Sequence, residues 1–296
     1  MSTYNTVMIN KIRDKKHMNL NFGISTMVYY HEVIEKLLPY LNDADIRNIE
    51  IRPHIGHFEC QDPELIDKLK KRIEYFNISV KSVHMPMDSV DISHPEEYDR
   101  IRSIREIEKA IMVALKLNAE LVVIHPGGKY NNSDDRKIRL NNCVNSLKEI
   151  TEFCTQWNIK IALENTLPGR LGDRWTEIQQ MIENISSEHL GVCLDTGHYL
   201  LNQQDNERGK LSLEKEPINW QKNLLHVHAH DNNGKEDLHL LPEEGLFSWI
   251  SLISYLKIIK YDGALIVEPK VQEVQLPNYL DKVRNAFERL GYLWTI

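Results

Sequence analysis

The sequence predicts a single α/β domain built as a (β/α)8 TIM barrel, and three observations support this fold class. Short apolar runs alternate with amphipathic segments from about residue 19 onward. The apolar runs are almost continuously hydrophobic, as expected of parallel strands that are buried on both faces. Their spacing gives eight strand–helix units in a chain of 296 residues, which matches the size of such a barrel.

Each expected strand is a run of aliphatic residues that stops at or beside a polar one. The expected strands are residues 20–26, 46–52, 79–84, 121–125, 159–164, 190–195, 224–229 and 263–268. An open, doubly wound sheet is the structural alternative, but it normally has fewer strands. The sequence also lacks the GxGxxG and GxxxxGK[ST] loops that nucleotide-binding sheets of that kind use.

Between these runs, apolar residues recur at helical spacing, for example Ile104, Ile107 and Ile111. The clearest helix start is Asp62–Pro63, because an aspartate can cap the helix and proline suits its first turn. The expected helices are residues 62–76, 95–117, 134–157, 174–185, 247–260 and 277–290.

The polar, lysine-rich residues 1–18 are expected to form an N-terminal extension before one barrel domain of residues 19–296. No linker rich in Pro, Gly or Ser divides that domain. The long polar segment 202–217 follows the sixth strand directly. It is expected to be either a lid over the site or a plain surface insertion.

Composition narrows the functional class. The net charge of -7 gives no sign of a strongly basic nucleic-acid surface. The cysteines Cys60, Cys143, Cys154 and Cys193 form no CxxC pair, so buried reduced thiols are expected. The N-terminus lacks the apolar core of a signal peptide, and no run approaches the roughly 20 apolar residues of a membrane span. We therefore expect a cytoplasmic protein with no membrane partner.

Polar side chains at the strand ends are the main functional signal. Glu164, Asp195, His228 and Glu268 end the fifth to eighth strands, and the carboxyl ends of barrel strands meet at one mouth. Three carboxylates and one imidazole suit Mn, Mg or Co, and they can also hold Zn. A salt bridge or a helix cap would explain any one of these residues alone, but four consecutive strands that end in this way favour a metal centre.

Five further residues form a second layer around this set. His84 and His125 end the third and fourth strands, His198 follows in DTGH, and Asp237 and His239 lie in DLHLLPEEG. They could bind additional metal ions, or they could bind substrate hydroxyls and orient the metal ligands. His230 could also share the face of His228, because side chains alternate along a strand.

The motifs VHMP, VIHPGG, ALENT, LDTGH, HAHDNNGKEDLHL and VEP together resemble the xylose-isomerase-like TIM barrel superfamily, from about residue 20 to 290. This superfamily holds sugar and sugar-phosphate isomerases and epimerases, together with AP endonuclease family 2. The resemblance to the isomerase branch implies one divalent metal bound by Glu164, Asp195, His228 and Glu268. It also implies that Glu164 and Glu268 act as acid and base, moving a proton through a metal-stabilised enediolate of a sugar or sugar phosphate.

The resemblance to the nuclease branch implies an alternative, a zinc phosphodiesterase that acts on abasic DNA. Three zinc ions would then be held by the same four residues plus His84, His125, His198, Asp237 and His239. All nine positions are occupied in this chain. The isomerase is nevertheless favoured, because no basic, aromatic-rich loop follows the early strands. One departure from the sugar-enzyme pattern is Glu243-Glu244-Gly245, where Gly-Glu-Gly is usual.

A few positive residues are candidates for binding a phosphate group. Lys129 follows HPGG, and Arg170 follows ALENT. Either could bind a sugar phosphate or a DNA backbone, or it could be an exposed loop charge. A barrel that has lost catalysis and only binds a metabolite is a third hypothesis, although both glutamates are intact. A homodimer is a reasonable expectation for a barrel of this kind.

Overall fold

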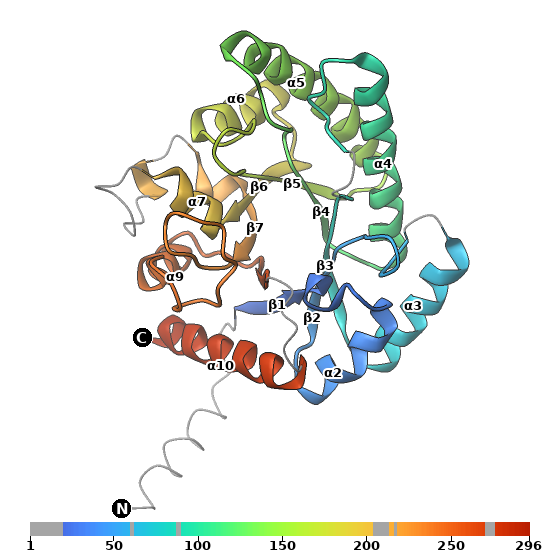
Figure 1. The fold of residues 1–296 in the computed structure, drawn as a ribbon, viewed down its shortest axis with the longest axis vertical. Coiled ribbons are helices and arrows are strands. Elements are labelled where there is room, and N and C mark those ends of the chain that lie inside the picture. The colour runs from blue at the N-terminus through green and yellow to red at the C-terminus, as the bar shows by residue number, and fades with distance from the viewer. Residues whose placement is uncertain (1–19, 60–61, 87–89, 204–212, 216–217, 270–275) are drawn as a thin grey trace, which may run out of the picture.

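The structure is a computed structural model that describes residues 20–59, 62–86, 90–203, 213–215, 218–269 and 276–296. Eight parallel strands form a closed barrel in the order β1 to β8. Figure 1 shows the strands at the centre and the helices following one another around them in chain order. The predicted fold class, a (β/α)8 barrel, is confirmed.

The strands lie close to their predicted positions. They are β1 Asn21–Ser25, β2 Asn48–Ile51, β3 Ser79–His84, β4 Leu121–Ile124, β5 Lys160–Glu164, β6 Leu190–Asp195, β7 Leu224–Ala229 and β8 Ala264–Val267. β1 closes the ring by pairing with β8, from Asn21 opposite Ala264 to Ile24 opposite Val267. All the aliphatic strand residues except Leu225 are buried, on both faces of the sheet, which explains their continuous hydrophobicity.

The long helices also agree with the prediction. They are α3 Pro63–Tyr75, α4 Glu97–Lys116, α5 Ser133–Thr155, α6 Trp175–Ile185, α9 Trp249–Ile258 and α10 Leu276–Thr295. Asp62 caps α3 as expected, because its carboxylate accepts hydrogen bonds from the backbone N–H groups of Glu64 and Leu65. α10 packs against α9 and against α2 (Leu37–Asp43), which closes the outer ring (Figure 1).

The prediction omitted the short helices. They are α2, α7 Thr196–Asn202, α8 Trp220–Asn223 and the 3₁₀ turns η1 Thr26–Tyr29, η2 Ile34–Lys36 and η3 Leu213–Lys215. The α-helices among them span seven residues or fewer, which is too short for a clear helical period. η1 and α7 matter for the site, since they follow β1 and β6 directly at the mouth of the barrel.

Three further expectations concern the cysteines, two segments of the chain and membrane spans. Cys143, Cys154 and Cys193 are buried free thiols, as predicted. Cys60, residues 1–18 and most of the segment 202–217 lie outside the described residues. Among the helices that the structure describes, none is both long enough and apolar enough to cross a bilayer.

Candidate metal centre

The closed barrel brings the four strand-end residues to one place. Glu164 and Asp195 are the last residues of β5 and β6, His228 is next to last in β7, and Glu268 directly follows β8. Asp195 and His228 are register partners on neighbouring strands. All four side chains are buried at the carboxyl end of the barrel.

The three carboxylates converge on one nitrogen of His228. Its Nδ1 lies 3.3 Å from Glu164 Oε2, 3.6 Å from Glu268 Oε1 and 3.9 Å from Asp195 Oδ2. Ligand atoms about 2.0–2.2 Å from a shared cation are typically separated by such distances. Within the described residues, His228 Nδ1 has no hydrogen-bond partner. A buried imidazole nitrogen without a partner, surrounded by carboxylates, fits a metal ligand.

The second layer joins the same network. His84 Nε2 and His125 Nε2 each lie 3.3 Å from Glu164 Oε2. His198 Nδ1 lies 3.6 Å from Asp195 Oδ1, and its Nε2 lies 3.9 Å from Asp237 Oδ2. His239 Nε2 lies 3.2 Å from the same Asp237 oxygen. The structure therefore brings all nine candidate ligands into one connected cluster, although their individual roles remain proposals.

Backbone carbonyls orient three of the imidazoles. Nδ1 of His84 lies 2.8 Å from the carbonyl oxygen of Met85, and Nδ1 of His239 lies 2.8 Å from that of Glu268. His198 Nδ1 lies 2.9 Å from the Asn165 carbonyl oxygen. Each ring can donate one N–H to a carbonyl and leave its Nε2 available to a cation, which is the usual arrangement of histidine ligands.

His230, which the sequence indicated only weakly, also belongs to the cluster. Its Nε2 lies 2.9 Å from the Asp195 carboxylate, and its ring stacks on His239 with a centroid distance of 4.0 Å. Gly197 makes this position possible, because a Cβ there would lie 2.0 Å from His230 Cε1. The glycine of DTGH is therefore a packing requirement of the site.

Two further charged residues were missed by the sequence analysis: Glu50 lies in β2, and Arg52 directly follows it. Arg52 Nη1 lies 2.6 Å from Glu268 Oε1, and Glu50 Oε2 lies 3.1 Å from His228 Nε2. The run IEIR ends in charged residues just as the other strands do. That signal was available in the sequence for Arg52, whereas Glu50 lies one residue before the end of the strand.

The charges of the cluster compensate one another. Burial opposes ionisation of Glu164, but the His228 and His125 imidazoles hold its pKa well below the usual range. Burial likewise opposes ionisation of Glu268, yet His228 and Arg52 lower its pKa to about 2. For His239, hydrogen bonding to Asp237 and the nearby acids outweigh burial and raise the pKa to about 9.

These residues fit a divalent cation. Metal ligands must be ionised carboxylates and neutral imidazoles, so an ion would replace the protons that now balance the carboxylates. Groups whose ligand atoms all lie within 4.8 Å of one another include His84, His125 and Glu164; Glu164, Cys193 and His228; Glu50, His226 and His228; Asp195, His198 and His230; and His230, His239 and Glu268. The cluster therefore offers more than one set of ligand atoms for an ion.

The candidate phosphate-binding residues lie in neighbouring loops. Lys129, after β4, and Arg170, after β5, are paired in an isolated antiparallel bridge. The loop after β4 packs tightly against the segment between β3 and α4, because a Cβ at Gly127 would lie 2.0 Å from Ser93 Oγ. Arg136 links the same loops through Asp173, at 2.6 Å. A phosphate-binding role for Lys129 or Arg170 remains a proposal.

Aromatic side chains lie on loops at the same end of the barrel. Tyr30 stacks on His31 with a centroid distance of 5.1 Å and meets His54 edge-on at 4.8 Å.

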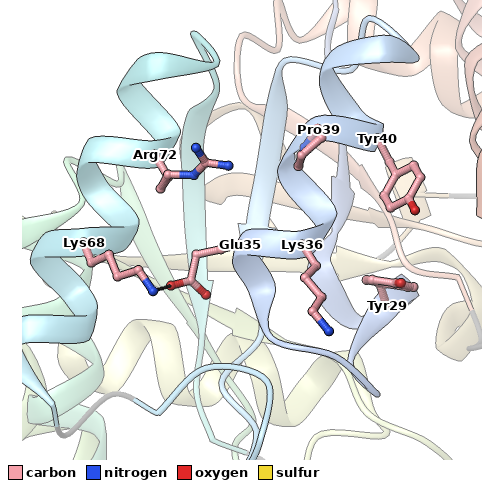
Figure 2. A pocket seen from close by; sticks show the side chains of 7 residues that line it. All are labelled: Tyr29, Glu35, Lys36, Pro39, Tyr40, Lys68 and Arg72. Carbon is pink, nitrogen blue, oxygen red and sulfur yellow. Dashed lines mark ion pairs between the residues drawn. The ribbon is translucent and has the colours of Figure 1, made fainter.

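A separate hollow of about 610 Å³ lies between α2 and α3 (Figure 2). It is lined by Tyr29, Glu35, Lys36, Pro39, Tyr40, Lys68 and Arg72. This hollow shares no residue with the carboxylate–histidine cluster.

Comparisons with known proteins agree with the fold. A family model described as a xylose isomerase-like TIM barrel matches residues 38–290. The uncharacterized protein MJ1311 of Methanocaldococcus jannaschii is 30% identical over 266 residues, which cover 87% of each chain. A probable endonuclease 4 of Aquifex aeolicus is 26% identical over 252 residues, or 81% of this chain and 86% of that protein. The crystal structure of a D-tagatose 3-epimerase-like protein matches with a TM-score of 0.79 and 26% identity, over 94% of this chain and 100% of the other.

Proposed function

The chain belongs to the xylose isomerase-like TIM barrel family, and we propose that within it the protein is a divalent-metal-dependent isomerase or epimerase of a sugar or sugar phosphate. The observation that carries this proposal is the convergence of Glu164 and Glu268 on Nδ1 of His228, at 3.3 and 3.6 Å. Similarity to the D-tagatose 3-epimerase-like protein over nearly the whole chain supports the same substrate class.

The barrel topology lets the two glutamates approach a substrate from different sides. β5 and β8 are three strands apart in the ring, so the carboxylates at their ends are not neighbours along the sheet. One carboxylate can remove a proton from a carbon while the other returns a proton to the opposite face or to the adjacent atom. His228 lowers the pKa of both carboxyl groups in the metal-free protein, which favours the ionised form that removes a proton; the carboxylate that acts as the acid must take up a proton before it can return one.

A bound divalent cation would supply the Lewis acidity, polarising the carbonyl of an open-chain sugar and acidifying the adjacent C–H bond. Glu164, Asp195, His228 and Glu268 are the residues we propose to hold it. The imidazoles of His84 and His125 lie on the Glu164 side of the cluster, and we propose that they bind hydroxyl groups of the sugar. Arg52 holds the Glu268 carboxylate on the other side.

The alternative is a zinc phosphodiesterase acting on abasic DNA. One observation favours it specifically, namely that His84, His125, His198, Asp237 and His239 all join the same network as the four proposed ligands. The similarity to a probable endonuclease 4 is consistent with it. This alternative requires three zinc ions, where the isomerase requires one.

Metal content and isotope exchange together test the proposal. Protein purified without chelator, then supplied with Mn²⁺, Co²⁺, Mg²⁺ or Zn²⁺, is incubated in D₂O with a panel of ketoses and their phosphates. We expect about one ion per chain and deuterium incorporation at the carbon next to the carbonyl. Glu164→Gln and Glu268→Gln should each slow this exchange by about 10²–10⁴-fold, because each removes a proton-transfer group.

The matched control is Glu120→Gln, since Glu120 is a half-exposed glutamate that pairs with Lys81 at 2.5 Å. It should exchange at the rate of the unsubstituted protein. Three zinc ions per chain, cleavage of an abasic duplex and no deuterium incorporation into any sugar would instead establish the phosphodiesterase.

A further inference from the structure

We propose that Glu50, a buried residue of β2, is a positioning residue that fixes His228 as an Nδ1 metal ligand. The inference rests on the metal centre of the proposed function and adds a residue that touches neither the substrate nor the metal. Its basis is a hydrogen bond to the far side of the His228 ring.

The two nitrogens of His228 face different surroundings. Nε2 lies 3.1 Å from Glu50 Oε2, whereas Nδ1 faces the carboxylates of Glu164 and Glu268. A carboxylate only accepts hydrogen bonds when ionised, so Glu50 requires the proton of a neutral His228 to be on Nε2. This tautomer leaves the Nδ1 lone pair directed at the cluster, as a metal ligand requires.

Glu50 is held in place by two more donors. Its Oε2 accepts from Ser82 Oγ at 2.7 Å and lies 3.1 Å from His226 Nε2. The side chain is fully buried, and burying a lone carboxylate is costly. Here the surrounding imidazoles and the hydroxyl compensate that cost, so the charge is retained inside the barrel beside His228.

The partner of His228 differs in kind from those of its neighbours. His84, His198 and His239 direct Nδ1 at backbone carbonyls, whereas His228 directs Nε2 at a carboxylate. A negatively charged acceptor makes the opposite nitrogen a stronger electron donor than a carbonyl does. His228 is also the residue on which Glu164, Asp195 and Glu268 converge, so its orientation sets the geometry of the whole centre.

The test measures zinc affinity by competition with a chromophoric chelator, with Glu50→Gln as the variant and Glu120→Gln as the control. Glutamine keeps the size of the side chain but removes the charge. We expect Glu50→Gln to weaken zinc binding by about 10–100-fold, and Glu120→Gln to leave it unchanged. A residue with only a structural role would lower the melting temperature without a selective loss of zinc affinity.

A second measurement uses the unsubstituted protein and so does not depend on the folding of a variant. ¹⁵N NMR of the zinc-loaded, histidine-labelled protein reports which nitrogen of each ring carries the proton. We expect His228 to be protonated at Nε2, the nitrogen that faces Glu50.

Three outcomes separate the possible failures. A folded Glu50→Gln variant with unchanged zinc affinity, or a His228 ring protonated at Nδ1, overturns the inference while the proposed function stands. Normal zinc binding with the expected loss in the variant, but no sugar turnover, supports the inference and refutes the proposed function. An unsubstituted protein that binds no divalent metal overturns both.

Discussion

Arg52 lowers the pKa of the neighbouring Glu268 in this site. The guanidinium and the carboxylate are 2.6 Å apart; Glu268 is buried, and Arg52 is partly exposed. Burial opposes ionisation of Glu268, yet His228 and Arg52 lower its pKa to about 2. A carboxyl group with so low a pKa stays ionised over the whole neutral range. Arg52 therefore keeps Glu268 ready as a ligand and weakens it as a base.

Replacing Arg52 by methionine should raise the pKa of Glu268 toward its ordinary value. In the metal-loaded protein, we expect the acid limb of the pH–rate profile for deuterium exchange to move up by about 1–3 pH units. Activity would then fall at a higher pH than in the unsubstituted protein, because Glu268 would be protonated sooner as the pH drops.

The control for this prediction is Arg105→Met, since Arg105 forms an exposed helix pair with Glu108 at 2.5 Å. Its profile should match that of the unsubstituted protein. Arg52→Lys should lie between the two, because it keeps the charge but loses the planar geometry. An acid limb that stays in place in Arg52→Met would show that Arg52 does not set the protonation of Glu268.

At the scale of elements, the strands and the long helices could be predicted because each leaves a strong local pattern. The run LVVIHP reads as a strand end, and Asp62–Pro63 reads as a helix start, without any knowledge of the rest of the chain. Because the parallel strands of a barrel all point the same way, their carboxyl ends meet at one mouth. The placement of Glu164, Asp195, His228 and Glu268 follows from that rule.

The remainder could not be predicted because it depends on contacts between distant segments. α7 is an exception, because its cap is local: Asp195, a proposed ligand, accepts a hydrogen bond from the His198 backbone N–H at 2.7 Å, and the helix was missed because its seven residues are too few for a clear period. Glu50 acquires its partner His228 from a strand 178 residues away. The position of the His230 ring depends on the space that Gly197 leaves because it has no side chain. None of these relations has a periodic signature in the sequence.

Gly197 offers a test at the scale of this strand–helix junction. A Cβ at this position would lie within 2.0–2.8 Å of three atoms of the His230 ring. We expect Gly197→Ala to displace His230, to lower stability by about 1–3 kcal/mol and to weaken metal binding through Asp195 and His198. Thermal denaturation and zinc titration would measure these effects.

The matched control is Gly291→Ala in α10, where the new Cβ would lie 3.8 Å from Phe22 Cε2. That change should be neutral or slightly stabilising, since alanine is the better helix former. A Gly197→Ala protein with unchanged zinc affinity would show that the His230 position does not contribute to the centre.

At the scale of the whole molecule, the site and the barrel depend on each other. The nine candidate ligands extend from His84 to Glu268 along the chain, and only the closed ring brings them together. The same closure buries carboxylates and imidazoles that would be costly to bury singly. Stability of the metal-free protein must therefore depend on the protons that balance these charges, and stability of the loaded protein on the ion that replaces them.

This dependence predicts how metal and pH act together on the melting temperature. The pKa of His239 is raised from 6.5 to about 9, so its protonated form stabilises the metal-free barrel fully below about pH 6.5. That contribution is lost as the pH rises through about 9. Metal binding requires neutral imidazoles, so affinity should rise over the same interval.

The difference in melting temperature between loaded and chelator-stripped protein should therefore widen from pH 6.5 to pH 9. At a metal concentration 100 times the Kd, the ion adds about 2.7 kcal/mol, or roughly 5–10 °C. Differential scanning fluorimetry at pH 6.5, 7.5 and 9, with and without zinc, measures the difference. His239→Gln should flatten the pH dependence of the metal-free protein, because the titrating imidazole is gone. A difference that narrows as the pH rises would mean that imidazole protons do not compete with the metal, contrary to the charge balance inferred for this cluster.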